Sequence, residues 1–387
     1  MANYIWQILF WLSIFLVLNA YLFYPIFIIL LSKLAKRKRE NEFFPALSIL
    51  IAAYNEEKVI EERLKNIAEL NYDLSKIEVL VGSDNSSDRT NDILKIAKKK
   101  YTWLKVYFFK ERSGKAGIMN KLISEAKHEI IVFSDANTIF DKNALLNLTP
   151  DFYDKNIGGI CGRLILKDEN TGDFEGVEEE VYWKLETFIK RAEGKLGILI
   201  GANGGIFAIR KSLFTNIPTK KAVTDDLFIS LQPLTKGYKV IYNENALAFE
   251  PVGKNVSEEF NRKVRFSATN FQTLVYLSKL LSPLRPLTAY AFFSHKVLRW
   301  TLPFLTIILF ISNLILFEQT EFYKIIFFIQ LGIYGFAFVG WILSKVKIRL
   351  IPFSLIYFFV ISNVALFLGF LKFLSGKHSV IWERTSR

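Results

Sequence analysis

Two polar residues directly after an apolar run mark the first candidate site. The stretch Glu129 to Phe140 reads EIIVFSDANTIF, so Asp135 and Asn137 follow a run of β-branched and aromatic residues. Such a run is typical of a parallel strand buried on both faces, and ligands of open α/β sheets bind just beyond the carboxyl ends of these strands. We therefore expect Asp135 and Asn137 to point into a site. The alternative is that Asp135 caps a helix over residues 141–148.

Three earlier strand patterns also end in polar or charged residues. ALSILIAAYNEE ends at Tyr54 and Glu56, IEVLV is followed by Asp84, and LKVYFF is followed by Lys115 in RSGKAGIMN. Helix patterns alternate with these strands through short polar turns, which predicts an α/β fold with a mostly parallel sheet and right-handed crossovers. Because the carboxyl ends of parallel strands meet, we expect these residues to share one edge of the sheet with Asp135.

Acidic and basic groups at such an edge suit a nucleoside diphosphate. A carboxylate accepts a hydrogen bond from a uracil imide or a ribose hydroxyl, a lysine neutralises the diphosphate, and an acidic turn holds a bridging divalent cation. The alternative is that Asp84 and Asp88 are turn and capping residues and that Lys115 is a solvated lysine at a helix start. The chain has no Gly-x-Gly-x-x-Gly after its first strand, and Gly114-Lys115 does not complete a P-loop.

The ends of the chain indicate a membrane protein. Hydrophobic residues make up 51% of the sequence, 36 residues are Phe, and the apolar runs concentrate near the two termini. Tyr4–Leu31 carries no charge and exceeds the roughly 20 residues that a membrane-spanning helix requires. Three more apolar runs follow at about residues 302–317, 322–343 and 350–374. We therefore expect one transmembrane anchor before the α/β domain and three transmembrane helices after it.

The basic residues predict the orientation of the chain. KLAKRKR follows the first span, which places the α/β domain in the cytoplasm by the positive-inside rule. The net charge of +13 gathers largely at the membrane flanks, so anionic lipid is the expected partner and nucleic acid is not. Three later spans would leave the C-terminus outside, although the tail carries Lys377, Arg384 and Arg387. A single cysteine, Cys161, excludes an intramolecular disulfide and suits a reducing cytoplasm.

Seven motifs in order resemble those of the membrane-integrated family 2 glycosyltransferases, the group containing hyaluronan, cellulose and poly-N-acetylglucosamine synthases. They are AAYNEE, GSDNSSDRT, SGKAGIMNK, SDANT, GANGGIFAIRKSLF, TDD and RKVRF, and they cover roughly residues 46–274. The resemblance implies a GT-A fold, a UDP-sugar donor, Mg²⁺ or Mn²⁺ as cofactor, and inverting transfer to a hydroxyl acceptor. We expect an N-terminal anchor at 1–33, a GT-A domain at 45–270, interfacial helices at 271–300, transmembrane helices at 301–375 and a tail at 376–387.

The resemblance assigns roles on the donor side. It implies that the donor is bound by Tyr54, Glu56, Asp84, Lys115, Asp135 and Arg265. Asp135 matches the first Asp of the family's Asp-x-Asp motif, and both Asp135 and Asn137 would be metal ligands. Asn137 departs from the family pattern, because an amide oxygen is a poorer ligand for a hard cation than a carboxylate.

The resemblance also assigns a base and an acceptor side. TDD matches the family's Thr-Glu-Asp element, which makes Asp226 the catalytic base that takes the proton of the attacking hydroxyl. Capping of a helix that begins at Leu227 is the alternative role, and the two are compatible. RKVRF stands where processive members carry Gln-x-x-Arg-Trp, with Arg262 at the Gln position and Phe266 at the Trp position. These two residues and Gly204 would line the acceptor side, and processive or single transfer stays open.

Three functions are compatible with the sequence. The first is a plasma-membrane enzyme that builds a cell-surface glycan or exopolysaccharide from a UDP-sugar, with N-acetylglucosamine or glucose favoured, on a glycan or lipid-linked acceptor. The second is a polyprenyl-phosphate glycosyltransferase, against which RKVRF after TDD argues. The third is a non-catalytic membrane scaffold, motivated by the departures at Asn137 and Arg262. The retained acidic and basic motif residues favour an enzyme.

Overall fold

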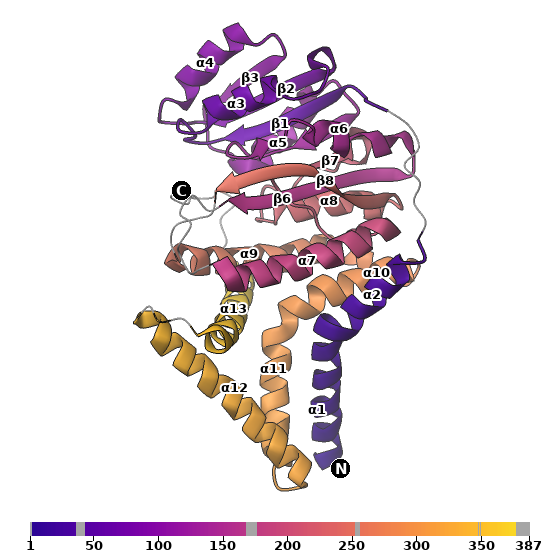
Figure 1. Ribbon diagram of the computed structural model, residues 1–387, viewed down its shortest axis with the longest axis vertical. Helices are drawn as coiled ribbons and strands as arrows, with labels where there is room; N and C mark the ends of the chain where they lie inside the picture. The colour runs from indigo at the N-terminus through magenta and orange to yellow at the C-terminus, as the bar shows by residue number, and fades with distance from the viewer. Residues whose placement is uncertain are drawn as a thin grey trace.

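The computed structural model describes residues 2–35, 43–167, 176–251, 256–346, 348 and 350–376. An α/β domain lies at one end of the molecule and long apolar helices lie at the other (Figure 1). Two further helices, α7 (Gly176–Leu196) and α9 (Val256–Tyr276), lie between the sheet and the apolar helices. The C-terminal tail, residues 377–387, lies outside the described residues.

The domain is built on one eight-stranded sheet of order β3-β2-β1-β4-β7-β6-β8-β5. β1 pairs in parallel with β2 and β4, β2 with β3, and β6 with β8. β7 is antiparallel to β4 and β6, and β5 is antiparallel to β8. The predicted mostly parallel sheet is therefore confirmed, with three antiparallel pairings beyond β4. The strands are β1 Leu47–Ala53, β2 Ile77–Asp84, β3 Leu104–Phe109, β4 Ile130–Phe133, β5 Ile139–Phe140, β6 Ile157–Lys167, β7 Phe207–Arg210 and β8 Lys239–Pro251.

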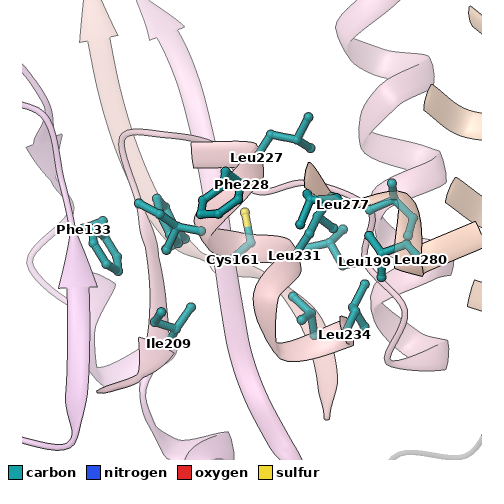
Figure 2. Close-up of a cluster of buried hydrophobic side chains, with 14 of the residues drawn as sticks. Phe133, Cys161, Leu199, Ile209, Leu227, Phe228, Leu231, Leu234, Leu277 and Leu280 are labelled. Atoms are coloured by element: carbon teal, nitrogen blue, oxygen red, sulfur yellow. The ribbon is translucent and has the colours of Figure 1, made fainter. Parts of the chain in front are cut away.

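Helices cover both faces of the sheet because alternate residues of the central strands face opposite sides. In β1, Leu50 belongs to one buried cluster and Ile49 and Ile51 to the other. Figure 2 shows Leu227, Phe228 and Leu231 of α8 packed near Cys161 of β6, within the first cluster. The domain helices are α3 Ile60–Ala68, α4 Thr90–Lys100, α5 Gly114–Glu125, α6 Ala144–Leu148 and α8 Asp225–Thr235.

Within the described residues, four helices are long and apolar enough to cross a membrane: Asn3–Ser32, Pro286–Leu316, Glu321–Lys345 and Ile351–Leu374. The prediction of four such segments is confirmed, but the second begins at Pro286 and not near residue 302. The run is α10 (Pro286–Phe292), the π-helical turn η6 (Phe293–Val297) and α11 (Leu298–Leu316). A continuous helix thus runs through part of the region 271–300, where separate interfacial helices were expected.

Polar residues near the start of this second helix lower the hydropathy of its sequence. In the structure these residues form hydrogen bonds and ion pairs with other residues of the chain. His295 is fully buried, with Nδ1 2.6 Å from Glu193 Oε1 and Nε2 2.9 Å from Glu186 Oε1. Tyr24, in the first apolar helix, donates its hydroxyl to Glu193. Glu193 also accepts a hydrogen bond from the backbone N–H of Ile200 at 3.0 Å. Helix α7 therefore connects two apolar helices to the loop after it.

Candidate active site

The turns after β1 and β2 are tied together by hydrogen bonds. The backbone N–H of Asn55 donates to Ser86 Oγ at 3.1 Å, and that of Ser87 donates to Asn55 Oδ1 at 2.8 Å. Asn55 has φ of +55°, a conformation that asparagine tolerates better than most residues. Asp88 accepts from the N–H of Thr90 at 3.0 Å, which fits the turn role considered for Asp88, whereas the N-cap residue of α4 is Arg89. The turn that carries Tyr54 and Glu56 is therefore fixed to its neighbour.

Asp84 holds the amino end of α5. Its two carboxylate oxygens accept from the N–H groups of Ser113 at 2.7 Å and Gly114 at 2.9 Å. Arg112 Nε lies 3.7 Å from the same carboxylate, and its guanidinium lies 3.4 Å from the centre of the Tyr54 ring. The expected residues Tyr54 and Asp84 thus meet at Arg112, which sequence reasoning missed. Its position in the turn just before Lys115 was the available signal.

Lys115 joins three strand and helix ends. Its Nζ lies 2.7 Å from Asp135 Oδ1 and 3.0 Å from Asp225 Oδ2. Burial favours the neutral amine, but the charges of Asp135 and Asp225 outweigh it and raise the pKa of Lys115 well above its ordinary value. The amine therefore stays cationic and is not a freely solvated lysine. Asp135 faces Lys115, and the N-cap residue of α6 is Asn143, so the proposed capping role of Asp135 is wrong.

Asp226 lies beside this cluster with a perturbed carboxyl group. Burial and the neighbouring charge of Asp225 raise the pKa of Asp226 to about 6, while Lys115 opposes the shift. Its Oδ1 accepts from the N–H of Leu227 at 2.7 Å inside the first turn of α8. The helix begins at Asp225 and its N-cap residue is Thr224, so the alternative of a helix that begins at Leu227 and is capped by Asp226 is wrong. A Cβ atom at Gly204 would lie 3.2 Å from Asp226 Oδ2, so this loop packs directly on the carboxylate. Sequence reasoning found Asp226 but missed Asp225 as the second partner of Lys115.

The loop Gly201–Gly205 is held on several sides. Asn203 accepts from the buried Nζ of Lys190 on α7 at 2.5 Å. Gly201 has φ of +97°, which favours glycine. A Cβ at Gly205 would lie 2.5 Å from Glu250 Oε1, so glycine is needed there for space. Backbone conformation at Gly201 and lack of space at Gly205 therefore explain why glycine occupies these positions of the loop beside Asp226.

Helix α9 brings the RKVRF element to the TDD segment. Thr224 Oγ1 donates to Asn270 Oδ1 at 2.8 Å. Arg262 and Phe266 precede Asn270 by eight and four residues, so the three share one side of the helix. The guanidinium groups of Arg262 and Arg265 lie 5.9 and 5.6 Å from the centre of the Phe266 ring. Thr224, next to the acidic pair, is thus the connection between this element and the site.

Residues 134–140, the acidic turn, carry Asp135 and Asn137 and fit a divalent cation that arrives with a phosphate ligand. The side chain of Asp135 is 31% exposed and supplies carboxylate oxygen. Asn137 supplies an amide, whose buried Nδ2 has no hydrogen-bond partner within the described residues. The same part of the chain holds no group of three His, Cys, Asp or Glu residues arranged for a metal. Mg²⁺ commonly binds one or two carboxylates and completes its shell with substrate phosphates and water.

The sheet order and this strand-end site define an α/β domain of the GT-A type. Residues 48–217 match the family described as Glycosyl transferase family 2, so the chain contains a family 2 glycosyltransferase domain. The match confirms the predicted relation and, with it, the predicted enzyme class.

Relatives and a solved structure extend the comparison. The chain is 25% identical over 234 residues to a poly-beta-1,6-N-acetyl-D-glucosamine synthase of Staphylococcus aureus strain COL, covering 59% of this chain and 55% of that protein. It is 24% identical over 280 residues to the protein of that name from Staphylococcus epidermidis, covering 67% and 66%. The chain thus spans about half the length of the first of these relatives. The mannosyltransferase PcManGT from Pyrobaculum calidifontis, solved with GDP-Man and Mn²⁺, superposes with a TM-score of 0.70 at 19% identity, covering 95% of this chain and 99% of that one. This likeness confirms the fold.

Proposed function

We propose that this protein is an inverting membrane glycosyltransferase that moves a sugar from a UDP-sugar to a hydroxyl of a growing glycan or a lipid-linked acceptor. The observation that carries the proposal is the position of Lys115 between Asp135 and Asp225, beside Asp226. A fixed cation next to a carboxylate of raised pKa provides both groups that the transfer requires. The cation takes the leaving diphosphate, and the carboxylate takes the acceptor proton.

On the donor side, the nucleoside lies against the turns after β1 and β2. The guanidinium of Arg112 stacks on the Tyr54 ring, and the pair offers a flat face to the nucleoside base. The carboxylates of Glu56 and Asp84 accept hydrogen bonds from the base and ribose. Lys115 and Arg265 offset the charge of the diphosphate. Mg²⁺ or Mn²⁺ on Asp135 and Asn137 supplies additional positive charge there when bound.

On the acceptor side, Asp226 takes the proton as the hydroxyl attacks the anomeric carbon. UDP leaves from the opposite face of the sugar, which inverts the configuration. Gly204 lies against the Asp226 carboxylate, where an added Cβ would approach Oδ2 to 3.2 Å, so a side chain at this position would crowd the base. Phe266 offers an apolar face to a sugar ring and Arg262 a hydrogen-bond donor.

The relatives support the substrate and compartment parts of the proposal. Two are named as synthases of poly-beta-1,6-N-acetyl-D-glucosamine, which favours UDP-N-acetylglucosamine as donor and cell-surface polysaccharide as product. PcManGT was solved with a nucleotide sugar and Mn²⁺, which supports a nucleotide-sugar donor and a divalent cation. The four apolar helices support a multi-pass plasma-membrane protein in contact with lipid, with the domain in the cytoplasm.

A panel of nucleotide sugars tests this proposal. Full-length protein in nanodiscs with Mn²⁺ should release UDP from UDP-N-acetylglucosamine faster than from UDP-glucose, and faster than GDP from GDP-mannose. Mass spectrometry of the products should show sugar additions, as a ladder for processive synthesis or as one step. Chelation with EDTA should stop the release. If the protein binds no nucleotide sugar at millimolar concentration, the scaffold function replaces the enzyme.

The pH dependence of turnover should report the raised pKa of Asp226. The base must be ionised to accept a proton, so kcat/KM should fall as the pH drops below about 6 and level off above it. With an aspartate of ordinary pKa as the base, kcat/KM would stay unchanged down to about pH 4. The measurement is kcat/KM between pH 4.5 and 8 in wild-type protein whose folding is monitored at each pH. A flat profile down to pH 4.5 would contradict the assignment.

A further inference from the structure

A buried arginine packs against the acidic turn without touching Lys115, Asp225 or Asp226 in any hydrogen bond of the described residues. Arg63 of α3 is fully buried. Its Nη2 donates to the buried Ser134 Oγ at 3.0 Å, directly before Asp135. Its guanidinium also lies 4.1 Å from the centre of the Phe140 ring, at the other end of the turn. One side chain therefore contacts both ends of the segment that contains Asp135 and Asn137.

Asn66 completes this contact from the next turn of α3. Arg63 Nη1 donates to Asn66 Oδ1. That same oxygen accepts from the N–H of Phe140 at 2.9 Å, and Asn66 Nδ2 donates to the Phe140 carbonyl at 2.9 Å. The exit of the acidic turn is thus fixed by a two-way amide contact, and the orientation of that amide is set by Arg63.

A carboxylate also contacts the acidic turn between its two ends. The fully buried Thr138 donates its hydroxyl to Glu250 of β8. Glu250 also lies where a Cβ at Gly205 would be, so the acidic turn and the loop beside Asp226 meet at this carboxylate. A hydrogen-bonded support therefore reaches the turn at residues 134, 138 and 140.

The charges of this support act on Asp135. Burial lowers the pKa of Arg63 to about 9, and the charges of Asp135 and Glu250 oppose the shift. The guanidinium is thus cationic at neutral pH and close enough to interact with both carboxylates. Burying a guanidinium without full pairing is costly, and Arg63 Nε has no hydrogen-bond partner among the described residues. The free-energy cost of burying Arg63 next to the turn that carries Asp135 and Asn137 indicates that Arg63 positions this turn.

We propose that Arg63, together with Asn66 and Glu250, is a positioning residue that holds the acidic turn in the geometry that binds a divalent cation with the donor diphosphate. The inference rests on the proposed function. Residues that orient the ligands of a metal typically change metal affinity about 10- to 100-fold when replaced. Arg63 touches no reacting atom in this scheme and acts through the turn.

Metal binding without turnover tests the inference. Full-length wild type, Arg63→Lys and Ser134→Ala are titrated with Mn²⁺ in the presence of UDP, and electron paramagnetic resonance measures free Mn²⁺. Lysine keeps the charge but cannot contact Ser134 and Asn66 together, and Ser134→Ala removes one contact with little change of volume. Both variants should bind Mn²⁺ about 10- to 100-fold more weakly. Wild-type affinity in the folded variants would overturn the inference.

Arg210→Lys is the matched control. Arg210 lies 5.4 Å from the Phe152 ring and donates to the carbonyls of Ile157 and Phe152, beside the start of β4 and away from the acidic turn. This variant should lower the melting temperature while leaving Mn²⁺ affinity unchanged. Equal losses of affinity in Arg210→Lys and Arg63→Lys would assign the effect to general destabilisation and overturn the inference. A wild type that binds no Mn²⁺ with UDP would overturn the proposed function itself.

Discussion

Replacing Asp226 with Asn should abolish glycosyl transfer while the protein stays folded. The amide cannot accept the proton of the acceptor hydroxyl, and a positioned general base contributes about 10²- to 10⁴-fold to rate. Its oxygen can still accept the Leu227 N–H, and loss of the carboxylate removes the repulsion from Asp225 that raises the pKa of Asp226. We expect kcat to fall about 10²- to 10⁴-fold, with an unchanged or higher melting temperature and unchanged UDP affinity.

Asp225→Asn is the matched control, because it removes a carboxylate from the adjacent position. Asp225 pairs with Lys115 and raises the pKa of Asp226, so its loss should move the acidic limb of the pH profile to lower pH and leave measurable turnover. The comparison is made from initial rates of UDP release and of product formation. If Asp225→Asn is inactive and Asp226→Asn is active, the base is Asp225.

The sequence predicted that several residues of the proposed donor side would lie together, because parallel strands bring their carboxyl ends to one edge. Asp84, Lys115 and Asp135 are each close to the end of a strand pattern, and the structure places Lys115 in contact with Asp135. Hydropathy also predicted four apolar helices. It placed the start of the second apolar helix too late, because polar residues such as His295 interrupt the apolar run. These residues are tolerated in the helix because acidic partners on α7 pair with them.

The residues that were missed join the site through tertiary contacts that no local sequence pattern indicates. Arg112 folds back over Tyr54, and Asp225 meets Lys115 from a helix more than one hundred residues away in the chain. Periodicity alone cannot assign such partners. One signal was present for Arg63, since positions 60, 63, 64 and 67 form a single buried stripe of α3. A charged residue on an apolar stripe indicates a buried partner, which here is the acidic turn.

Lys115→Met should cause the second large loss of activity. In the proposed site the variant removes a charge-assisted contact to the diphosphate, a type of interaction worth about 1.5–3 kcal/mol, or roughly 10- to 100-fold in affinity. It also leaves Asp135 and Asp225 facing the diphosphate without their shared cation. We expect UDP binding to weaken by roughly that factor, as measured by calorimetry, and kcat to fall further because the leaving diphosphate loses the same cation.

The pH profile distinguishes a role of Lys115 in the site from a role in folding. The ammonium group lowers the pKa of Asp226, so in Lys115→Met that pKa should rise and the acidic limb should move to higher pH. Lys121→Met is the control, because Lys121 lies on the same helix but is exposed and stacks over Phe109. It should keep wild-type UDP affinity and pH profile. An acidic limb that stays in place in Lys115→Met would show that Lys115 and Asp226 do not interact as the site requires, since a cation this close to a carboxylate must affect its ionisation.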